Sequence, residues 1–205
     1  MIQIVNEQLT VQIDPLGAQM HSIKRNAAGL EYLWQGDPKS WKRQAPVLFP
    51  FVGRLKDDQY EYQGKVYHQT QHGFARDREF QVVEQSSERV VLSCVMMKNA
   101  GCLPVCFCVT IAYQLDEDRL LVSYRVENPS NDQTLIYALG AHPGFNVPVM
   151  NRAVLKRLSS VFHRRLTINR LNWSHLVHLM IWNIQRFCTC SSPLHWIMSC
   201  LMRMP

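Results

Sequence analysis

Residues 9–13 read Leu-Thr-Val-Gln-Ile, an alternation of apolar and polar side chains that stops at Asp-Pro-Leu-Gly, residues 14–17. A period of two predicts a β-strand with one buried face, because successive strand side chains point to opposite sides of a sheet. Proline and glycine directly after the alternation predict a tight turn. A second strand is expected at residues 18–24, closing at residues 26–29. The start of the chain therefore predicts antiparallel sheet.

Short segments of the same kind recur as far as residue 139, and no amphipathic helix is expected before residue 150. The predicted strands are residues 31–34, 80–84, 89–96, 109–115, 120–127 and 134–139, with a hairpin of residues 59–62 and 65–67 around Gln63-Gly64. Residues 46–52 contain two prolines and are expected to form an edge strand or an extended segment. The predicted fold class is all-β, and a sandwich is the preferred architecture.

The composition changes abruptly near residue 150. Residues 1–150 contain 14 Lys and Arg and all 16 Asp and Glu, a net charge of −2, whereas residues 151–205 contain 8 basic and no acidic residues, a net charge of +8. All 9 Gly and all 7 Tyr precede residue 146. We therefore expect residues 1–150 to be the N-terminal part of a β-sandwich domain and residues 151–205 to be an anomalous basic tail. Because the β region is slightly acidic, no nucleic-acid partner is expected.

Several classes of protein are excluded at this level. Residues 1–7 lack the basic start and apolar run of a signal peptide, and the apolar run of residues 47–52 is far too short to span a bilayer. The 7 Cys are odd in number, which does not favour a disulfide framework. A cytoplasmic protein without a membrane partner is expected.

Three polar residues of the β region stand beside glycine or proline in apolar surroundings: Arg54, His72 and His142. His142 lies in Gly-Ala-His-Pro-Gly-Phe, residues 140–145, where small turn-forming residues leave room around the imidazole. Each has a plain alternative interpretation, namely a surface salt bridge for Arg54 and a surface turn for each histidine. Histidine can both give and take a proton near neutral pH, and arginine offers several fixed donors to oxygen.

An ordered set of motifs links these residues. It comprises Gly-Ala at residues 17–18, Glu-Tyr-Leu-Trp at 31–34, Ala-Pro-Val-Leu-Phe-Pro at 45–50, Gly-Arg at 53–54, His-Gly-Phe-Ala-Arg at 72–76, and residues 140–145. Over residues 1 to about 150 the chain resembles the aldose 1-epimerase (galactose mutarotase-like) superfamily, and it looks most like the LacX-type branch.

The resemblance implies a β-sandwich, or supersandwich, with a sugar cleft on one sheet face. It further implies interconversion of the α and β anomers of a hexose without metal or cofactor. By the family pattern His142 is the general acid that protonates the ring oxygen, and His72 belongs to the same catalytic group. Arg54, His72 and Arg76 are the expected substrate-binding residues. A glutamate from late in the chain is the expected base for the anomeric hydroxyl.

Two alternatives stay open. Arg76 and Arg78 lie close to the His72 motif, and a phosphate bound there would make the protein a hexose-6-phosphate epimerase. The domain would instead be a non-catalytic carbohydrate-binding module if the polar residues bind sugar and no base is present. Neither the preferred sugar nor the oligomeric state is predicted. Trp34, Phe74 and Phe145 are candidates to pack against a sugar face, although core packing is the preferred interpretation.

The chain departs from the family pattern at the expected base, because no Glu follows Glu127 and no Asp follows Asp132. Compared with the family it resembles, the chain is expected to be truncated. Loss of part of a sandwich exposes strand edges and an apolar sheet face, so impaired catalysis and poor solubility are also expected.

The tail has three interpretations. Val154, Leu155, Leu158, Val161, Phe162 and Leu166 lie at helical spacing among basic residues, which is typical of a basic amphipathic helix. His175, His178, Cys188, Cys190, His195 and Cys200 are a possible ligand set, although their spacing fits no zinc pattern and no metal is expected. A shifted reading frame is the third interpretation. Codons that the genetic code permits for residues 101–108 and for residues 151 onward can be chosen so that a shifted frame encodes amino-acid sequences that resemble the family.

Overall fold

The computed structural model describes residues 1–96, 104–130 and 133–146, together with the backbone of residues 178–179, 188–190 and 196–203. Its first sheet contains β1 (Ile2–Val5), β2 (Leu9–Asp14), β3 (Gln19–Arg25) and β4 (Leu30–Glu31), antiparallel and in chain order. Alternate residues of β2 are buried, as its period of two predicts. The first predicted strands are therefore confirmed, whereas the expected strand at residues 31–34 is replaced by the shorter β4.

The second sheet has five antiparallel strands in the order β17-β11-β10-β9-β8. They are β8 (Gln81–Gln85), β9 (Arg89–Met96), β10 (Phe107–Asp116), β11 (Arg119–Glu127) and β17 (Trp196–Arg203). In β10 and β11 every second residue is buried, so each strand has one face on the core.

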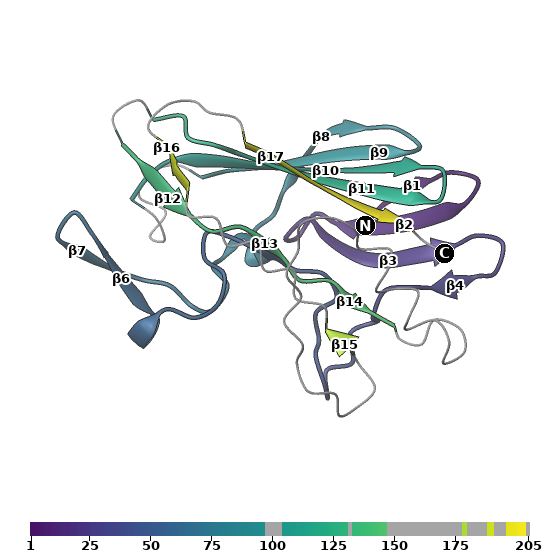
Figure 1. Cartoon of the computed structure of the whole chain (residues 1–205), viewed down its shortest axis with the longest axis horizontal. Coiled ribbons are helices and arrows are strands. Elements are labelled where there is room, and N and C mark those ends of the chain that lie inside the picture. Colours follow the sequence, from purple (N-terminus) through teal and green to yellow (C-terminus); the bar gives the residue numbers. More distant parts are fainter. Residues whose placement is uncertain (97–103, 131–132, 147–177, 180–187, 191–195, 204–205) are drawn as a thin grey trace.

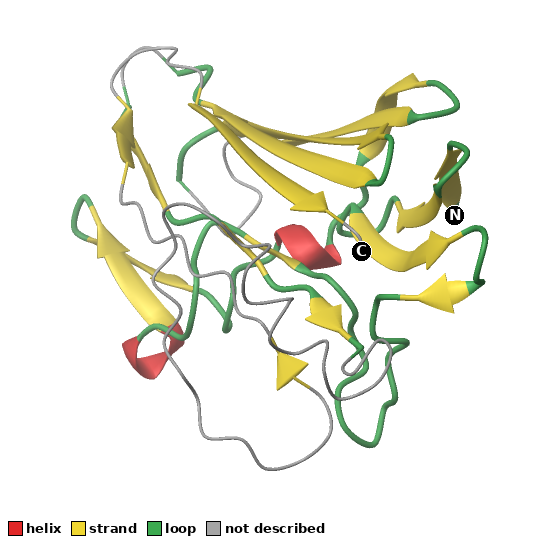
Figure 2. Ribbon diagram, turned by 45° about the vertical axis from the view of Figure 1, so that its right-hand side comes forward, coloured by secondary structure: helices red, strands yellow, loops and turns green. Residues whose placement is uncertain are grey.

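The two sheets enclose one hydrophobic core. Figure 1 shows the five-stranded sheet lying over the four-stranded one, and buried residues of both sheets form a single cluster. The buried Tyr113 hydroxyl on β10 donates a 2.7 Å hydrogen bond to the carbonyl of Ala18, which ties the layers together. In the described residues the helical elements are two short 3-10 turns, η1 (Lys56–Asp58) and η2 (Ala75–Asp77) (Figure 2). The prediction of an all-β sandwich is confirmed.

Four smaller antiparallel pairs complete the described structure. β5 (Val47–Leu48) pairs with β13 (Gly140–Ala141), β6 (Gln59–Tyr62) with β7 (Lys65–His68), β12 (Leu135–Tyr137) with β16 (Cys188–Cys190), and β14 (Gly144–Phe145) with β15 (His178–Leu179). The pairing of β5 with β13 matters for function, because it joins the segments that carry two of the candidate motifs.

The predicted hairpin around Gln63-Gly64 is confirmed and projects from the body of the molecule (Figure 1). The rings of Tyr60 and Tyr67 stack across the two strands with their centroids 5.4 Å apart. The Tyr62 hydroxyl donates a hydrogen bond to the Thr134 carbonyl, which attaches the hairpin to the segment before β12.

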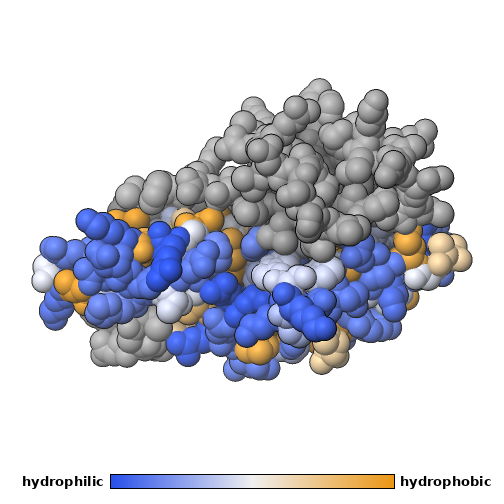
Figure 3. Space-filling model, turned by 90° about the horizontal axis from the view of Figure 1, so that it is seen from below, coloured by the Kyte–Doolittle hydropathy of each residue, from blue (hydrophilic) through white to orange (hydrophobic). Residues whose placement is uncertain are grey.

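The surface seen in Figure 3 is mostly hydrophilic where residues are described, with small separate hydrophobic areas. The described part of the chain contains no helix long and apolar enough to cross a bilayer. The amphipathic helix expected within residues 154–166, the side chains of the possible ligand set from His175 to Cys200, and residues 101–103 lie outside the described residues.

Candidate functional site

A close backbone crossing builds the loop that carries His72. The carbonyl of Phe49 accepts hydrogen bonds from the N–H groups of Phe74, at 3.0 Å, and Ala75, at 3.1 Å. Gly73, directly before these two donors, has a φ of +70°, and a Cβ at this position would lie 2.1 Å from the Phe49 carbonyl oxygen. Only glycine fits both the conformation and the space. The motif of residues 72–76 is therefore held against the motif of residues 45–50.

His72 is anchored to Gly53 by two hydrogen bonds in opposite directions. Its backbone N–H donates to the Gly53 carbonyl at 2.8 Å, and its Nδ1 accepts the Gly53 N–H at 3.0 Å. Because Nδ1 is the acceptor, the neutral imidazole carries its proton on Nε2. Burial, followed by the charge of Arg76, lowers the pKa of His72. His72 is thus a neutral ring with a single N–H donor of fixed direction.

His142 lies between β13 and β14, and its backbone N–H donates to the Pro46 carbonyl at 3.1 Å. The residue is 7% exposed, so the alternative of a surface turn is wrong for this histidine. The centroids of the His142 and His72 rings are 5.8 Å apart. The His142 Nε2 atom is buried and has no hydrogen-bond partner among the described residues. An unsatisfied buried nitrogen is unfavourable, which marks this atom as a candidate ligand contact.

The surroundings of His142 favour its neutral form. Burial lowers its pKa to about 4, and the nearby His72 and Arg76 act in the same direction. The imidazole is therefore almost entirely neutral at pH 7. A general acid has to carry a proton, so the expected role of His142 requires a negative charge close enough to raise its pKa.

The charge of Arg76 acts on both histidines and lowers the pKa of each. Its Nη2 donates a 2.6 Å hydrogen bond to the Gln71 carbonyl, and its Nε is buried without a hydrogen-bond partner in the described structure. Burial, followed by the nearby charge of Arg43, lowers the pKa of Arg76. Asp77 raises the pKa of Arg76. Its carboxylate is shared with Arg43, from which it accepts a 2.6 Å hydrogen bond. The structure thus places a cation with spare donor capacity beside the histidine pair.

Arg54 is placed differently. Its side chain is 69% exposed and forms a bidentate ion pair with Asp58, from Nε to Oδ1 at 2.8 Å and from Nη2 to Oδ2 at 2.7 Å. This pair raises the pKa of Arg54 and lowers that of Asp58. Arg54 follows Gly53, the anchor of His72, but its guanidinium is turned to Asp58. The role of Arg54 in sugar binding stays a prediction.

Sequence reasoning missed Trp41. Its ring lies on His142 with centroids 5.0 Å apart and planes inclined by 49°. The available signal was a lone aromatic residue within the polar stretch Gln-Gly-Asp-Pro-Lys-Ser-Trp-Lys-Arg-Gln of residues 35–44. Of the other aromatic candidates, Phe74 is buried in the core and Phe145 packs against the core. The indole N–H of Trp34 donates to the Trp41 carbonyl.

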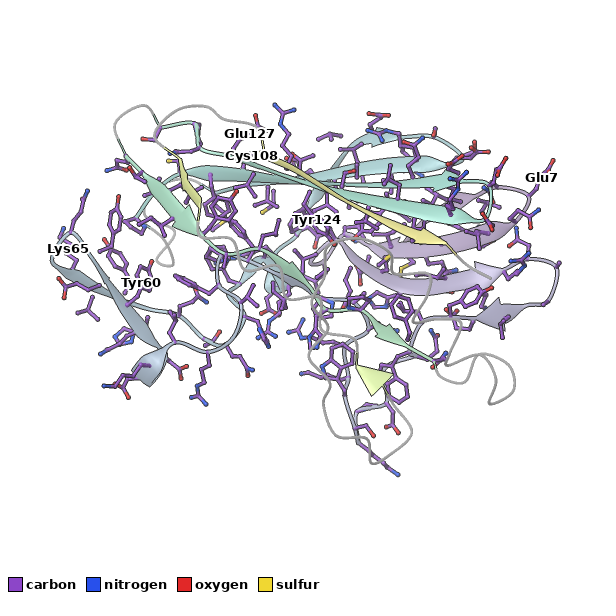
Figure 4. The ribbon with its side chains drawn as sticks, viewed as in Figure 1. Glu7, Tyr60, Lys65, Cys108, Tyr124 and Glu127 are labelled. Atoms are coloured by element: carbon purple, nitrogen blue, oxygen red, sulfur yellow. The ribbon has the colours of Figure 1, made fainter. Side chains whose placement is uncertain are left out.

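The last glutamate of the chain lies on the sheet. Glu127 ends β11, accepts a 2.9 Å hydrogen bond from Arg125 and faces Cys108 of β10 in the strand register (Figure 4). In the described ranges no group of three His, Cys, Asp or Glu side chains is placed to hold a metal ion.

A family model described as aldose 1-epimerase matches residues 1–173. The chain belongs to the aldose 1-epimerase family. The match includes every motif on which the resemblance rested, and it extends past residue 150. Family membership shows a carbohydrate epimerase-like class for this chain.

Relatives of known sequence and structure agree with this assignment. The chain is 38% identical over 157 residues to the chromosomal protein LacX of Lactococcus lactis subsp. lactis, an alignment that covers 73% of this chain and 52% of LacX. It is 40% identical, with a TM-score of 0.70, to a galactose mutarotase related enzyme from Lactobacillus acidophilus, covering 72% of this chain and 49% of that one. A galactose mutarotase-like protein from Lactobacillus casei is 35% identical, also with a TM-score of 0.70, covering 75% of this chain and 52% of that one.

This member of the aldose 1-epimerase family spans about half the length of the curated relatives that it matches. Residues 1–173, which the family model matches, include the histidine pair and both arginines of the candidate site.

Proposed function

We propose that the site of this chain binds a hexose and belongs to an enzyme that interconverts its α and β anomers. One observation carries the proposal: His72 and His142 come from separate family motifs, their rings lie 5.8 Å apart, and the buried His142 Nε2 has no partner in the described structure. A sugar hydroxyl or ring oxygen supplies the missing hydrogen bond.

The reaction requires two proton transfers. A base removes the proton of the anomeric hydroxyl, an acid protonates the ring oxygen, and the bond between the anomeric carbon and the ring oxygen breaks. The open-chain aldehyde rotates, and the reverse transfers close the ring on its other face. His142 exchanges the proton of the ring oxygen, whereas His72 donates from Nε2 to a sugar oxygen. Arg76 donates from Nε, which lies 3.7 Å from Asp77 but has no hydrogen-bond partner in the described structure.

We further propose that this chain is a poor catalyst by itself. The pKa of His142, lowered to about 4, leaves almost no protonated acid at pH 7. A carboxylate near the sugar would both accept the anomeric proton and raise the pKa of His142. The resemblance expects that carboxylate late in the chain, where this sequence contains no Glu or Asp after residue 132.

Polarimetry of freshly dissolved α-D-galactose and α-D-glucose, together with sugar titrations followed by NMR, tests these proposals. We expect sugar-dependent shifts of the His72 and His142 resonances but an anomer exchange rate close to that of buffer. Exchange well above buffer that disappears in His142→Gln, and persists in the matched variant His68→Gln of the exposed hairpin histidine, would contradict impaired catalysis while supporting the site. Absence of both binding and exchange would contradict the sugar site.

A hexose 6-phosphate is a second candidate substrate. The half-buried Arg76 has a buried Nε without a hydrogen-bond partner in the described structure, and its neighbour Arg43 adds a second positive charge that lowers the Arg76 pKa. A phosphate dianion would relieve this repulsion and bind through charge-assisted hydrogen bonds. Glucose 6-phosphate binding at least tenfold tighter than glucose, and lost selectively in Arg76→Gln, would favour this substrate. Equal affinities would reject it.

A further inference from the structure

Trp41 is fixed by its own loop. The Asp37 carbonyl accepts the backbone N–H groups of Ser40, at 3.0 Å, and Trp41, at 2.8 Å, which closes a turn just before the indole. On its other side the Trp41 carbonyl accepts the Trp34 indole N–H at 2.8 Å. The backbone N–H and the carbonyl of Trp41 are therefore both held.

Gly144 provides the space for the Trp41 ring. A Cβ at Gly144 would lie 2.9 Å from Cζ3 of Trp41 and 3.1 Å from Cβ of Trp34. The backbone of Gly144 is held in place, because its N–H donates to the Gln44 carbonyl at 2.7 Å and its carbonyl accepts the Trp34 N–H at 2.9 Å. The glycine two residues after His142 thus admits the indole to the site.

From this arrangement we infer that Trp41 is a positioning residue for His142. Its ring centroid lies 5.0 Å from that of the imidazole, and on this inference the indole shields the imidazole from water. The inference deepens the proposed function, since it concerns the same site, but it is tested without sugar.

Two effects of the indole oppose each other. An aromatic face attracts a cation, which would favour protonated His142. Removal of water favours the neutral ring, and burial is the largest cause of the lowered His142 pKa. His72 and Arg76 also face His142 and both lower its pKa. The net effect of Trp41 is therefore to keep His142 neutral.

The alternative is that Trp41 only stabilises the fold. Trp41 is half-buried and does not belong to the buried core cluster. A purely structural residue would change the free energy of unfolding when replaced, but it would not change the protonation of His142 in the folded protein.

NMR titration of the His142 ring, assigned by comparison with His142→Gln, separates the two roles. In Trp41→Ala we expect the pKa of His142 to rise from about 4 toward the ordinary histidine value of 6.5. Tyr67→Leu removes another half-buried aromatic ring on the hairpin and should leave the titration unchanged.

If Trp41→Ala does not fold, Trp41→Leu decides the question, because leucine stays apolar but leaves part of the imidazole uncovered. An unchanged His142 pKa in the folded variant would overturn the inference. Failure of the proposed function is recognised separately, since the intact protein would then show the lowered His142 pKa but no sugar binding.

Discussion

The backbone N–H of Gly53 donates a 3.0 Å hydrogen bond to Nδ1 of His72. This bond fixes the tautomer of the ring and leaves Nε2–H as its only donor. It also opposes protonation of His72, because a protonated Nδ1 cannot accept the bond. The contact therefore suits His72 to the hydrogen-bond donor role that we propose for it, in preference to the role of an acid.

Replacing His72 by Asn should separate anchoring from binding. The Asn oxygen can accept the Gly53 N–H, and Asn tolerates the φ of +69° at this position, so we expect the free energy of unfolding to stay within about 1 kcal/mol of wild type. The donor that Nε2 offered is lost, and sugar affinity should fall about tenfold. Urea unfolding and NMR sugar titration measure the two effects. Unchanged affinity would remove His72 from the binding site.

Stability should depend on the protonation of His142. Its pKa of about 4 in the folded chain lies below the value of 6.5 for the unfolded chain, so protons bind preferentially to the unfolded state. The stabilisation is fully present above pH 6.5 and is lost as the pH falls from 6.5 to 4, by about 3 kcal/mol in total. Burial lowers the pKa of His21 and His72 as well, which adds to the loss in the same direction.

Urea unfolding at several pH values measures this dependence. His142→Gln should flatten the curve between pH 6.5 and pH 4, whereas His68→Gln on the exposed face of the hairpin should follow wild type. Identical curves for wild type and His142→Gln would mean that His142 is not buried as a neutral ring.

The two glycines Gly73 and Gly64 should respond very differently to Ala. Both have positive φ, +70° and +73°, but a Cβ at Gly73 meets the Phe49 carbonyl oxygen at 2.1 Å and one at Gly64 meets no atom within 4 Å. Gly64→Ala should cost about 1 kcal/mol of unfolding free energy from backbone conformation alone. Gly73→Ala should cost more than about 4 kcal/mol, or prevent folding, because the backbone crossing must open. Similar losses at the two sites would contradict the crossing.

Arg54→Ala tests the one predicted site residue that the structure turns outward. Its pair with Asp58 is exposed, so we expect the urea midpoint to remain unchanged. Sugar affinity should fall about tenfold if the guanidinium leaves Asp58 to bind substrate. Arg89→Ala is the control at another ion pair, since Arg89 pairs with Glu84 at 2.8 Å, although its side chain is less exposed than that of Arg54, at 36%. Equal affinities for wild type and Arg54→Ala would exclude Arg54 from the site.

Local sequence pattern was sufficient for most strands of the described structure. The alternation of residues 9–13 predicted β2, residues 89–96 match β9, and Gln63-Gly64 marked the hairpin turn. These features depend on neighbours in the chain, namely the side-chain period of a strand and the turn preferences of glycine. β1 was not predicted, and the expected strand at residues 31–34 is only two residues long, Leu30–Glu31.

The strand at residues 31–34 shows why prediction failed there. The Glu31 carboxylate accepts the backbone N–H groups of Ile23 and Leu33, and Asn146 donates to the carbonyls of Glu31 and Leu33. Side chains thus satisfy backbone groups that a longer strand would have paired. The local pattern does not indicate the part played by Asn146, which is 113 residues from Leu33 in the sequence.

By itself the sequence determined the all-β class, the order of the motifs and the family to which they point, because these follow from local periodicity and from residue identity. Only the tertiary structure decided that the His72 and His142 rings lie together with the charge of Arg76 nearby, that Arg54 turns to Asp58, and that the Trp41 ring lies beside His142. Such properties depend on which distant groups pack around a side chain and exclude water from it. For the same reason the neutral state of His142 follows from its folded surroundings and could not be predicted from the residues beside it in the chain.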